Sequence, residues 1–377
     1  MKIAVLGAGM VGRAIAEDLA SGFDVTSFDN SAASLATLHK RNASVHTKQV
    51  NLLETQDFRS MLAPFGLVIT AVPGFMGFEV VKRVIAAGKD VVDISFSPED
   101  TLQLDALAKE NQVTAIVDCG VAPGMSNWVL GYYNDRMEIE DFECYVGGLP
   151  KIRKKPFEYK APFSPIDVIE EYTRPARYVE NSHLVIRPAL SDVELMDFEG
   201  VGTLEAFNTD GLRSILTTMK HIPNMKEKTL RYPGHVELIV ALKQSGFFSD
   251  EKVNINGVEV SPLQFSSALL FKEWKLNPGE EEFTVMKIIV TGKEKGRKKR
   301  VEYSLLDHYD LATQTTSMAR TTGYTCTAAA NLLLQKRFTA KGVFPPELIA
   351  GDENCFQHII QYLRERKVNW QMKAFDD

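Results

Sequence analysis

The chain has 377 residues, of which 45% are hydrophobic and 24% charged, and its formal net charge is −6. These values are typical of a globular enzyme of about two domains, and the negative charge gives no electrostatic reason to expect nucleic acid or an anionic membrane as partner. No apolar run approaches the ~20 residues of a membrane span. The sequence opens on an apolar strand and not on a secretion signal, so we expect a cytoplasmic protein with a small-molecule partner.

The first 120 residues alternate short apolar β segments with helical patterns. This alternation predicts a doubly wound parallel sheet with crossover helices, an α/β domain of the Rossmann type over residues 1–120. The expected strands are 3–6, 24–28, 67–71, 90–94 and 114–118, and the expected helices are 14–21, 31–40 and 77–87.

After Gly120 the pattern changes to strands separated by turns, with longer helices between them. Hairpin strands plus helices predict an α+β substrate and dimerisation domain with a mostly antiparallel sheet, over residues 121–309. One long helix, interrupted near Gly323, is expected over 310–336, so that the helices of 310–377 return to the first domain. Within 121–309 the expected strands are 143–146, 183–186, 253–255, 258–260, 283–291 and 299–305, and the expected helices 165–172, 212–220, 235–244 and 262–274.

A G-x-G-x-x-G motif follows the first expected strand and opens a helix. Its first glycine permits a tight turn, its second lets the backbone approach a pyrophosphate, and its third lets the helix pack closely on the strand. The helix N-terminus adds free N–H groups and the positive end of a dipole. The motif therefore predicts a dinucleotide site that includes Gly7, Gly9, Met10, Val11 and Gly12.

Asp29, at the end of the second expected strand, indicates which dinucleotide binds. It lies 22 residues after Gly7, where the acid that bonds the adenosine ribose hydroxyls is expected. Its carboxylate would repel the 2′-phosphate of NADP, and no Arg or Lys follows until Lys40. We therefore expect NAD as cofactor, although Asp29 could also serve only as a helix N-cap.

Other candidate residues lie at the carboxyl edge of the predicted parallel sheet, where ligands bind. The segment Ala71-Val72-Pro73 is expected to pass beneath the nicotinamide ribose, or to form a plain structural turn. Asp93 and Asp118 each end an expected strand. Asp93 is a candidate for catalysis and Asp118 for the cofactor site, and either could bind a substrate ammonium or cap a turn.

Short motifs recur in a fixed order along nearly the whole chain. After the glycine motif they are DISFSP at 93–98, DCGVAPG at 118–124, GGLP at 147–150, YK at 159–160, FS at 163–164, TLRYPGH at 229–235, SMA at 317–319, TGY at 322–324 and KGV at 341–343. In this order and spacing they resemble the saccharopine dehydrogenase family, and within it the L-lysine 6-dehydrogenases.

The resemblance implies hydride transfer at a C–N bond, an amino-acid substrate in the cleft between two domains, and a homodimer. By family position, Ser95, Phe96, Tyr159 and the stretch from Thr229 to Arg231 are expected to bind the substrate. Arg231 is the candidate for the substrate's α-carboxylate, through a bidentate pair. Its alternative role is a surface ion pair.

Two positions depart from the saccharopine reductases that this chain resembles. Those proteins carry Asp where this chain has Ala122, and Arg where this chain has Thr209. Threonine cannot hold a carboxylate with a guanidinium fork. A substrate with saccharopine's second amino-acid moiety would lose an anchor, whereas lysine fits what remains.

Proton transfer has two candidates. His235 stands at an expected helix start, whose dipole would keep it a neutral base, or it could be a capping or packing residue. Lys160 could act as acid or base if burial lowered its pKa, although most lysines project into water. Glu170 and Glu171 are expected on a solvated helix face. Cys119, Cys144, Cys326 and Cys355 are expected to be reduced structural thiols, and the sequence contains no metal-ligand pattern.

We therefore expect NAD-dependent oxidative deamination of the ε-amine of L-lysine, giving the semialdehyde that cyclises to piperideine-6-carboxylate. Reductive C–N bond formation, as in saccharopine or carboxynorspermidine synthesis, uses the same nicotinamide chemistry and stays open. The alternative from another class is a non-catalytic NAD-binding redox sensor that responds through domain closure.

Overall fold

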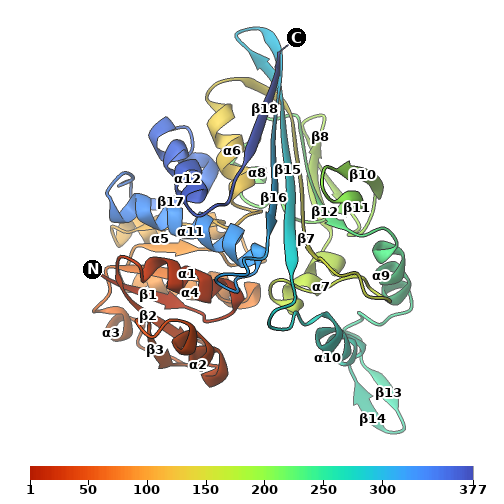
Figure 1. Ribbon diagram of the computed structural model, residues 1–377, viewed down its shortest axis with the longest axis horizontal. Helices are drawn as coiled ribbons and strands as arrows, with labels where there is room; N and C mark the ends of the chain where they lie inside the picture. Colours follow the sequence, from red (N-terminus) through yellow and green to blue (C-terminus); the bar gives the residue numbers. More distant parts are fainter. Residues whose placement is uncertain (377) are drawn as a thin grey trace.

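The structure of the protein is a computed structural model that describes residues 1–376, and of residues 165 and 166 only the backbone. Two large sheets organise the chain, one parallel and one mostly antiparallel, and helices pack against both (Figure 1). The expected fold class, a doubly wound parallel sheet joined to an α+β unit, is confirmed. None of the helices in the described part of the chain is long and apolar enough to cross a membrane.

The parallel sheet has seven strands in the order β17-β6-β5-β4-β1-β2-β3. The strand order reverses beside β1, which is where dinucleotides bind in doubly wound sheets. The strands are β1 Lys2–Leu6, β2 Asp24–Asp29, β3 His46–Gln49, β4 Leu67–Thr70, β5 Val91–Asp93, β6 Thr114–Ile116 and β17 Gly342–Phe344. The helices of this unit are α1 Met10–Leu19, α2 Ala32–Arg41, α3 Phe58–Leu62, α4 Gly74–Ala86 and α5 Asp105–Glu110.

Strand β1 illustrates why helices cover both faces of this sheet. Ile3 and Val5 belong to a hydrophobic cluster with residues of α1, whereas Ala4 and Leu6 belong to another cluster with residues of α3 and α4. A strand buried on both faces carries no polar alternation, so its sequence is a continuous apolar run. The layers on either side of the sheet and the apolar pattern that predicted it therefore have the same cause.

The second sheet runs in the order β10-β11-β12-β7-β15-β16-β18, and β8 and β9 extend it beside β12. The pair β12–β7 is parallel, and the long hairpin β15–β16 is antiparallel. The strands are β7 Glu138–Pro150, β8 Ala176–Glu180, β9 His183–Arg187, β10 Glu194–Phe198, β11 Gly202–Asn208, β12 Asn224–Arg231, β15 Glu282–Glu294, β16 Arg297–His308 and β18 Gln371–Asp376. The helices here are α6 Met125–Asn134, α7 Pro165–Thr173, α8 Ile215–Thr218, α9 His235–Gln244 and α10 Pro262–Trp274, and a separate hairpin joins β13 Val253–Ile255 to β14 Val258–Val260.

The long C-terminal helix starts later than the sequence pattern predicts. Helix α11 spans Ser317–Leu334. A turn closed by backbone hydrogen bonds between Asp310 and Thr315 precedes it, and the Thr316 hydroxyl caps it by accepting the Ala319 N–H at 3.3 Å. The prediction of a helix from residue 310 is therefore wrong, because the polar residues there form a turn and a cap.

Helix α11 is not interrupted at Gly323, as the sequence suggests, but passes through it. A Cβ atom on Gly323 would lie 3.3 Å from Ile15, so the glycine serves close packing of α11 on α1. Beyond α11, the segment is not only helical. Strand β17 joins the parallel sheet, helix α12 Glu353–Glu365 follows, and β18 joins the second sheet.

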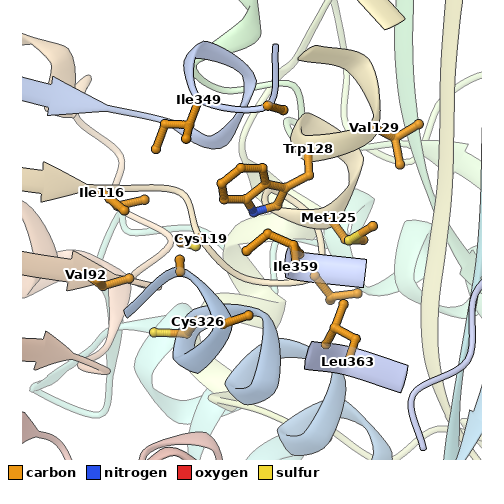
Figure 2. Packing of buried hydrophobic residues seen from close by; sticks show 14 of the residues in the cluster. Val92, Ile116, Cys119, Met125, Trp128, Val129, Cys326, Ile349, Ile359 and Leu363 are labelled. Carbon is orange, nitrogen blue, oxygen red and sulfur yellow. The ribbon is translucent and has the colours of Figure 1, made fainter. Parts of the chain in front are cut away.

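A shared core joins the parallel sheet to the helices beyond it. Figure 2 shows Trp128 of α6 surrounded by Cys119, Cys326 of α11 and Ile359 of α12, next to Ile116 of the parallel sheet. These side chains belong to one buried hydrophobic cluster. Helix α6 therefore begins the second part of the chain while it is packed against the first. All four cysteines are buried free thiols.

Candidate active site

A single cavity of about 640 Å³ reaches both sheets. Its volume suits a cofactor or a small molecule. We call one end the glycine half, lined by Gly7, Gly9, Met10, Val11, Gly12, Asp29 and Ala71–Pro73 together with 50–53. We call the other end the charged half, lined by Asp167, Glu171, Thr209, Gly211, Glu227, Thr229 and Arg231.

The three motif glycines have different surroundings. Gly7 has a φ of +114°, and a Cβ there would lie 2.2 Å from the Ala71 carbonyl oxygen. A Cβ on Gly12 would lie 2.2 Å from the Gly7 carbonyl oxygen, whereas a Cβ on Gly9 would meet no protein atom within 4 Å. The first and third glycines are therefore required by the turn itself. The second borders open space at the N-terminus of α1, as close approach to a pyrophosphate requires.

Asp29 lies at the carboxyl end of β2 and lines the same half of the cavity. Its carboxylate accepts the Ala8 N–H at 2.6 Å and the Ser31 N–H at 2.8 Å. These bonds fix its orientation, and Ser31 itself is the N-cap of α2. Arg13 lines the cavity nearby and donates to the Ala8 carbonyl at 3.1 Å. This end of the cavity thus has both an acidic and a basic side chain.

The two acids at the carboxyl edge of the sheet lie behind the cavity wall. Asp93 is buried and accepts hydrogen bonds from Thr70 Oγ1 at 2.5 Å and Ser95 Oγ at 2.7 Å. Burial raises the pKa of Asp93 to about 7. Burial also raises the pKa of Asp118, against the opposing effect of Arg213. Of the predicted residues here, Phe96 lines the cavity, whereas Ser95, Asp93 and Asp118 are not among the lining residues.

Strand β12 supplies one wall of the charged half. Side chains alternate along a strand, and Glu227, Thr229 and Arg231 share the face that lines the cavity. On the other face, Lys228 pairs with Glu194 of β10. Along this face the strand thus presents the carboxyl group of Glu227, the hydroxyl group of Thr229 and the guanidinium group of Arg231. The Cα atoms of Glu227 and Arg231 are roughly 13 Å apart.

Arg231 is buried and most of its hydrogen-bond donors are already engaged. Its Nε donates to Tyr172 Oη at 3.1 Å and one terminal nitrogen donates to the Leu230 carbonyl at 2.9 Å. The other terminal nitrogen donates to Glu171 Oε2 at 2.9 Å and to Tyr159 Oη at 3.4 Å. One N–H of the guanidinium is left, so a bidentate pair with a substrate carboxylate requires Glu171 to move aside.

Glu171 corrects the expectation of a solvated helix face. It lines the cavity and forms an ion pair with Arg231. Burial raises the pKa of Glu171, and the positive charge of Arg231 opposes this effect. Asp167, one turn earlier on α7, also lines the cavity and accepts the Gly74 N–H at 3.3 Å. Burial, followed by the charge of Glu170, raises the pKa of Asp167 to about 6.

Glu227 is the third carboxyl group of the charged half. Thr209 Oγ1 donates to Glu227 Oε2 at 2.7 Å and lies 2.9 Å from Thr229 Oγ1. Burial raises the pKa of Glu227 to about 8. Sequence reasoning missed Asp167, Glu171 and Glu227. The only available signal was the spacing of Glu227 at two and four residues from the motif residues Thr229 and Arg231.

The two proton-transfer candidates lie outside the cavity lining. His235 is buried, and its Nδ1 lies 2.9 Å from the Phe157 carbonyl, so that nitrogen carries the proton and Nε2 accepts from Tyr172 Oη, also at 2.9 Å. Burial, followed by the charge of Arg231, lowers the pKa of His235 to about 3. Lys160 Nζ donates to the Glu273 carbonyl at 2.6 Å. His235 therefore supports Tyr172, and Lys160 points to α10.

The fold and the cavity define a class, a protein with a doubly wound dinucleotide-binding unit whose second sheet adds a charged wall to the same cavity. The sequence matches the family descriptions "Saccharopine dehydrogenase NADP binding domain" over residues 3–116 and "Saccharopine dehydrogenase C-terminal domain" over residues 120–368. The chain therefore belongs to the saccharopine dehydrogenase family, a family of NAD(P)-dependent oxidoreductases, and the resemblance of its motifs to that family is confirmed.

The chain matches only part of the length of its curated relatives. The chain is 24% identical over 284 residues to the mitochondrial alpha-aminoadipic semialdehyde synthase of Rattus norvegicus, which covers 71% of this chain and 31% of that protein. It is 26% identical over 268 residues to a saccharopine dehydrogenase (NADP(+), L-glutamate-forming) of Pyricularia oryzae, covering 66% and 58% respectively. The chain thus spans about a third of the first relative and less than two thirds of the second.

Solved structures share the fold over the full chain. Apo saccharopine dehydrogenase (L-Glu forming) from Saccharomyces cerevisiae has a TM-score of 0.80 at 18% identity, with 99% of both chains covered. The homospermidine synthase of Legionella pneumophila in complex with NAD has a TM-score of 0.69 at 13% identity, covering 100% of this chain and 91% of that one. At these low sequence identities, the comparison shows that the fold is shared and nothing more.

Proposed function

We propose that the protein is an NAD-dependent oxidoreductase that removes the ε-amine of L-lysine, giving the semialdehyde, ammonia and NADH. The observation that carries this proposal is the division of one cavity between a backbone cradle and a wall with one arginine and three carboxyl groups. The backbone cradle of the glycine half suits a dinucleotide. The wall of the charged half suits an amino acid that carries an additional positive charge.

The glycine half fits the cofactor because the space beside Gly9 is open where a pyrophosphate would approach the backbone. Gly9, Met10 and Val11 would hold the pyrophosphate at the N-terminus of α1, and Asp29 would accept hydrogen bonds from the adenosine ribose. Bound there, NAD⁺ would supply the acceptor for a hydride. The segment 71–73 would lie against the nicotinamide side of the cofactor.

In the charged half, Arg231 would bind the α-carboxylate of lysine. Its remaining N–H is available, and Glu171 must give way for a second hydrogen bond. This exchange replaces one carboxylate by another on the same guanidinium, so Arg231 keeps an anionic partner. The carboxyl groups of Asp167 and Glu227 would face the ammonium groups of the substrate.

A second candidate function is reductive C–N bond formation on a diamine. The observation that favours it is the excess of acids in the charged half, where three carboxyl groups face one arginine. A dicationic amine would be attracted there at least as strongly as lysine. Arg231 argues for the amino acid, because a diamine has no carboxylate to offer it.

A substrate screen tests the proposal. The purified protein is offered lysine, ornithine, saccharopine and 1,5-diaminopentane with NAD⁺ or NADP⁺, and NADH or NADPH formation is followed by absorbance. We expect the highest kcat/KM with lysine and NAD⁺. Turnover of the diamine alone would favour the second candidate. No reduction of either cofactor with any amine would contradict an oxidoreductase role and favour a redox sensor. We also propose a homodimer from the family resemblance alone, which light scattering would test.

A further inference from the structure

Glu227 is a buried carboxyl group that borders the cavity without a cationic partner. Its residue is 7% exposed, and no ion pair with Glu227 occurs among residues 1–376. Its sequence neighbour Lys228 is on the opposite face of β12 and pairs with Glu194. A buried carboxylate without a partner is unfavourable, so the arrangement needs either a bound proton or a cation from outside the protein.

The carboxyl group is held by a loop that fits closely around it. Thr209 Oγ1 donates to it at 2.7 Å. The backbone N–H of Gly211 also stabilises its charged form. A Cβ atom on Gly211 would lie 2.2 Å from Oε2 of Glu227, so only glycine permits this approach. The contacts orient the carboxyl group, and none of them neutralises its charge.

The hydroxyl groups beside Glu227 have defined donor roles when the carboxylate is ionised. Because Thr209 gives its single proton to Glu227, Thr229 must donate to Thr209 across the 2.9 Å between their oxygens. The lone pairs of Thr229 Oγ1 then remain free on the side of the cavity that this residue lines. A nitrogen with several N–H groups could donate to both Thr229 and Glu227.

Other charges near Glu227 do not replace a cation. Glu171 of α7 and Asp210, in the loop before α8, both raise its pKa by repulsion. Asp210 is itself paired with Arg177, and Cys144 of the neighbouring strand β7 feels the charge of Glu227. The Arg231 guanidinium, on the same strand, is engaged by Glu171. The amine of a substrate is therefore the cation for which this position is suited.

We propose that Glu227 binds the reacting amine and accepts its proton, and that Thr209 and Thr229 are positioning residues for this transfer. The proposal rests on the proposed function, oxidation of an amine with NAD⁺. It assigns the proton transfer to a carboxyl group in the cavity wall and not to His235 or Lys160, neither of which lines the cavity.

Oxidation of the amine starts with a proton transfer to Glu227. The ammonium R–CH₂–NH₃⁺ gives one proton to the Glu227 carboxylate, leaving R–CH₂–NH₂ and a neutral carboxylic acid. The C–H bond then breaks, its electron pair reduces NAD⁺, and a C=N bond forms, giving R–CH=NH₂⁺. Water adds to this iminium ion and the C–N bond breaks, giving R–CHO and NH₄⁺. Glu227 returns its proton to solvent before the next turnover.

The ionisation of Glu227 predicts the pH dependence of the reaction. A base must be deprotonated to act, and burial raises the pKa of Glu227 to about 8. We therefore expect kcat/KM to fall as the pH decreases through about 8. Removing the Thr209 hydroxyl removes a bond that stabilises the carboxylate, so Thr209→Val should move this limb of the profile to higher pH.

The principal experiment compares Glu227→Gln with the control Glu143→Gln. Glu143 lies on the adjacent strand β7 and contacts Lys226 and Tyr145 outside the cavity lining. We expect Glu227→Gln to lower kcat/KM for lysine by ~10²- to 10⁴-fold, the range for a general base, and to abolish the limb near pH 8. The control should match the wild type, and the NADH affinity of both variants should be unchanged. An unaltered pH profile in Glu227→Gln would overturn the proposal.

A binding measurement keeps the proposal testable if no amine is turned over. Lysine and 1,5-diaminopentane are titrated calorimetrically into the NADH-bound protein at pH 7, in buffers of different ionisation enthalpy. A cation that ionises Glu227 should release nearly one proton per amine bound in the wild type and none in Glu227→Gln. Equal proton release in both, or binding of neither amine to the wild type, would overturn the assignment. Wild-type inactivity with normal proton release would contradict only the proposed reaction.

Discussion

In the glycine half of the cavity, the lining residues lie in turns at the carboxyl ends of neighbouring parallel strands, and they include the three motif glycines. In the charged half, the lining residues lie on α7, on β12 and in the loop before α8. The first half depends on where side chains are absent, as at Gly7 and Gly12. The second depends on charges held by one another, as in the pair of Arg231 with Glu171.

This difference predicts how the two halves respond to change. A backbone cradle is sensitive to added volume and tolerates changes of charge elsewhere, because its donors are peptide N–H groups. A wall of paired charges is sensitive to the loss of one partner, since the other is then left buried and uncompensated. Variants in one half should therefore leave ligand affinity in the other nearly unchanged.

Among the effects expected from this difference between the two halves, the largest concerns a second carboxylate in the charged half. Saccharopine would bring this group near Glu227, where Thr209 stands in place of an arginine and already donates to the glutamate. Desolvation without a cationic partner costs several kcal/mol. We expect kcat/KM for lysine to exceed that for saccharopine by about a thousandfold. Comparable values for the two substrates would contradict the lysine assignment.

A double variant provides the matched test of this selectivity. Thr209→Arg with Ala122→Asp introduces the residues found at these positions in the saccharopine reductases. Thr209 and Ala122 both line the cavity, so the new arginine would stand beside Glu227. We expect the ratio of kcat/KM for lysine to that for saccharopine to decrease but to stay above one. The reason is that the new arginine would be shared between Glu227 and the substrate.

Loss of the arginine should have the next largest effect. Arg231→Ala removes the anchor for the substrate carboxylate and leaves Glu171 unpaired. We expect kcat/KM for lysine to fall by ~10- to 100-fold, from the loss of a charge-assisted hydrogen bond. The Kd for NADH should stay within twofold, because the proposed site of the cofactor is the glycine half. A variant that lost NADH but kept its KM for lysine would show that the two halves are assigned wrongly.

Substitutions at Gly9 and Gly12 allow cofactor binding by the glycine half to be tested separately from the stability of the fold. Gly9→Ala adds a Cβ that meets no protein atom within 4 Å, so the melting temperature should not change. The same atom would intrude on the pyrophosphate, and at a cost of about 2 kcal/mol the affinity for NADH should fall about 30-fold. Gly12→Ala is the control of opposite kind. Its Cβ would lie 2.2 Å from the Gly7 carbonyl oxygen, so it should lower the melting temperature.

The glycine motif of this half could be predicted from sequence because it is local. Strand β1, the turn and helix α1 follow one another within the first twenty residues, and the apolar run of β1 marks the sheet. The boundaries of α9 and α10 agree with the prediction, since both begin at a clear helix start beside proline or glycine. The expected helix 212–220 is reduced to α8, because Arg213 has a left-handed φ of 51°, which a helix does not allow.

Most of the charged half could not be predicted, for physical reasons that the structure makes plain. Strand β12 carries charged residues on both faces, because one face lines the cavity and the other forms ion pairs with Glu143 of β7 and Glu194 of β10. It therefore has no apolar alternation and was not predicted as a strand. The sequence predicts a solvated Glu171, because the helical pattern alone does not show that α7 borders a cavity. The sequence predicts His235 as a base, but the residue is buried beside the rings of Tyr159 and Tyr172, and burial and the charge of Arg231 lower its pKa to about 3.

The smallest predicted effect is the choice between NAD and NADP, and it tests the one place where the glycine half depends on charge. Asp29 is held by the N–H groups of Ala8 and Ser31, so its carboxylate cannot easily turn away from an added phosphate. Arg13 nearby would attract that phosphate, and its bond to the Ala8 carbonyl keeps it close.

The Asp29 carboxylate is fixed by two backbone N–H donors, whereas Arg13 is held by one backbone acceptor. We therefore expect the repulsion of the 2′-phosphate of NADP by Asp29 to exceed its attraction by Arg13. The predicted preference for NAD in kcat/KM is at least tenfold, equivalent to about 1.4 kcal/mol. Asp29→Asn should reduce the preference, and adding Arg13→Ala should restore part of it by removing the attraction. Equal kcat/KM with both cofactors in the wild type would mean that Arg13 outweighs Asp29. Ligand binding in the glycine half would then depend on a pair of charged side chains, as it does in the charged half.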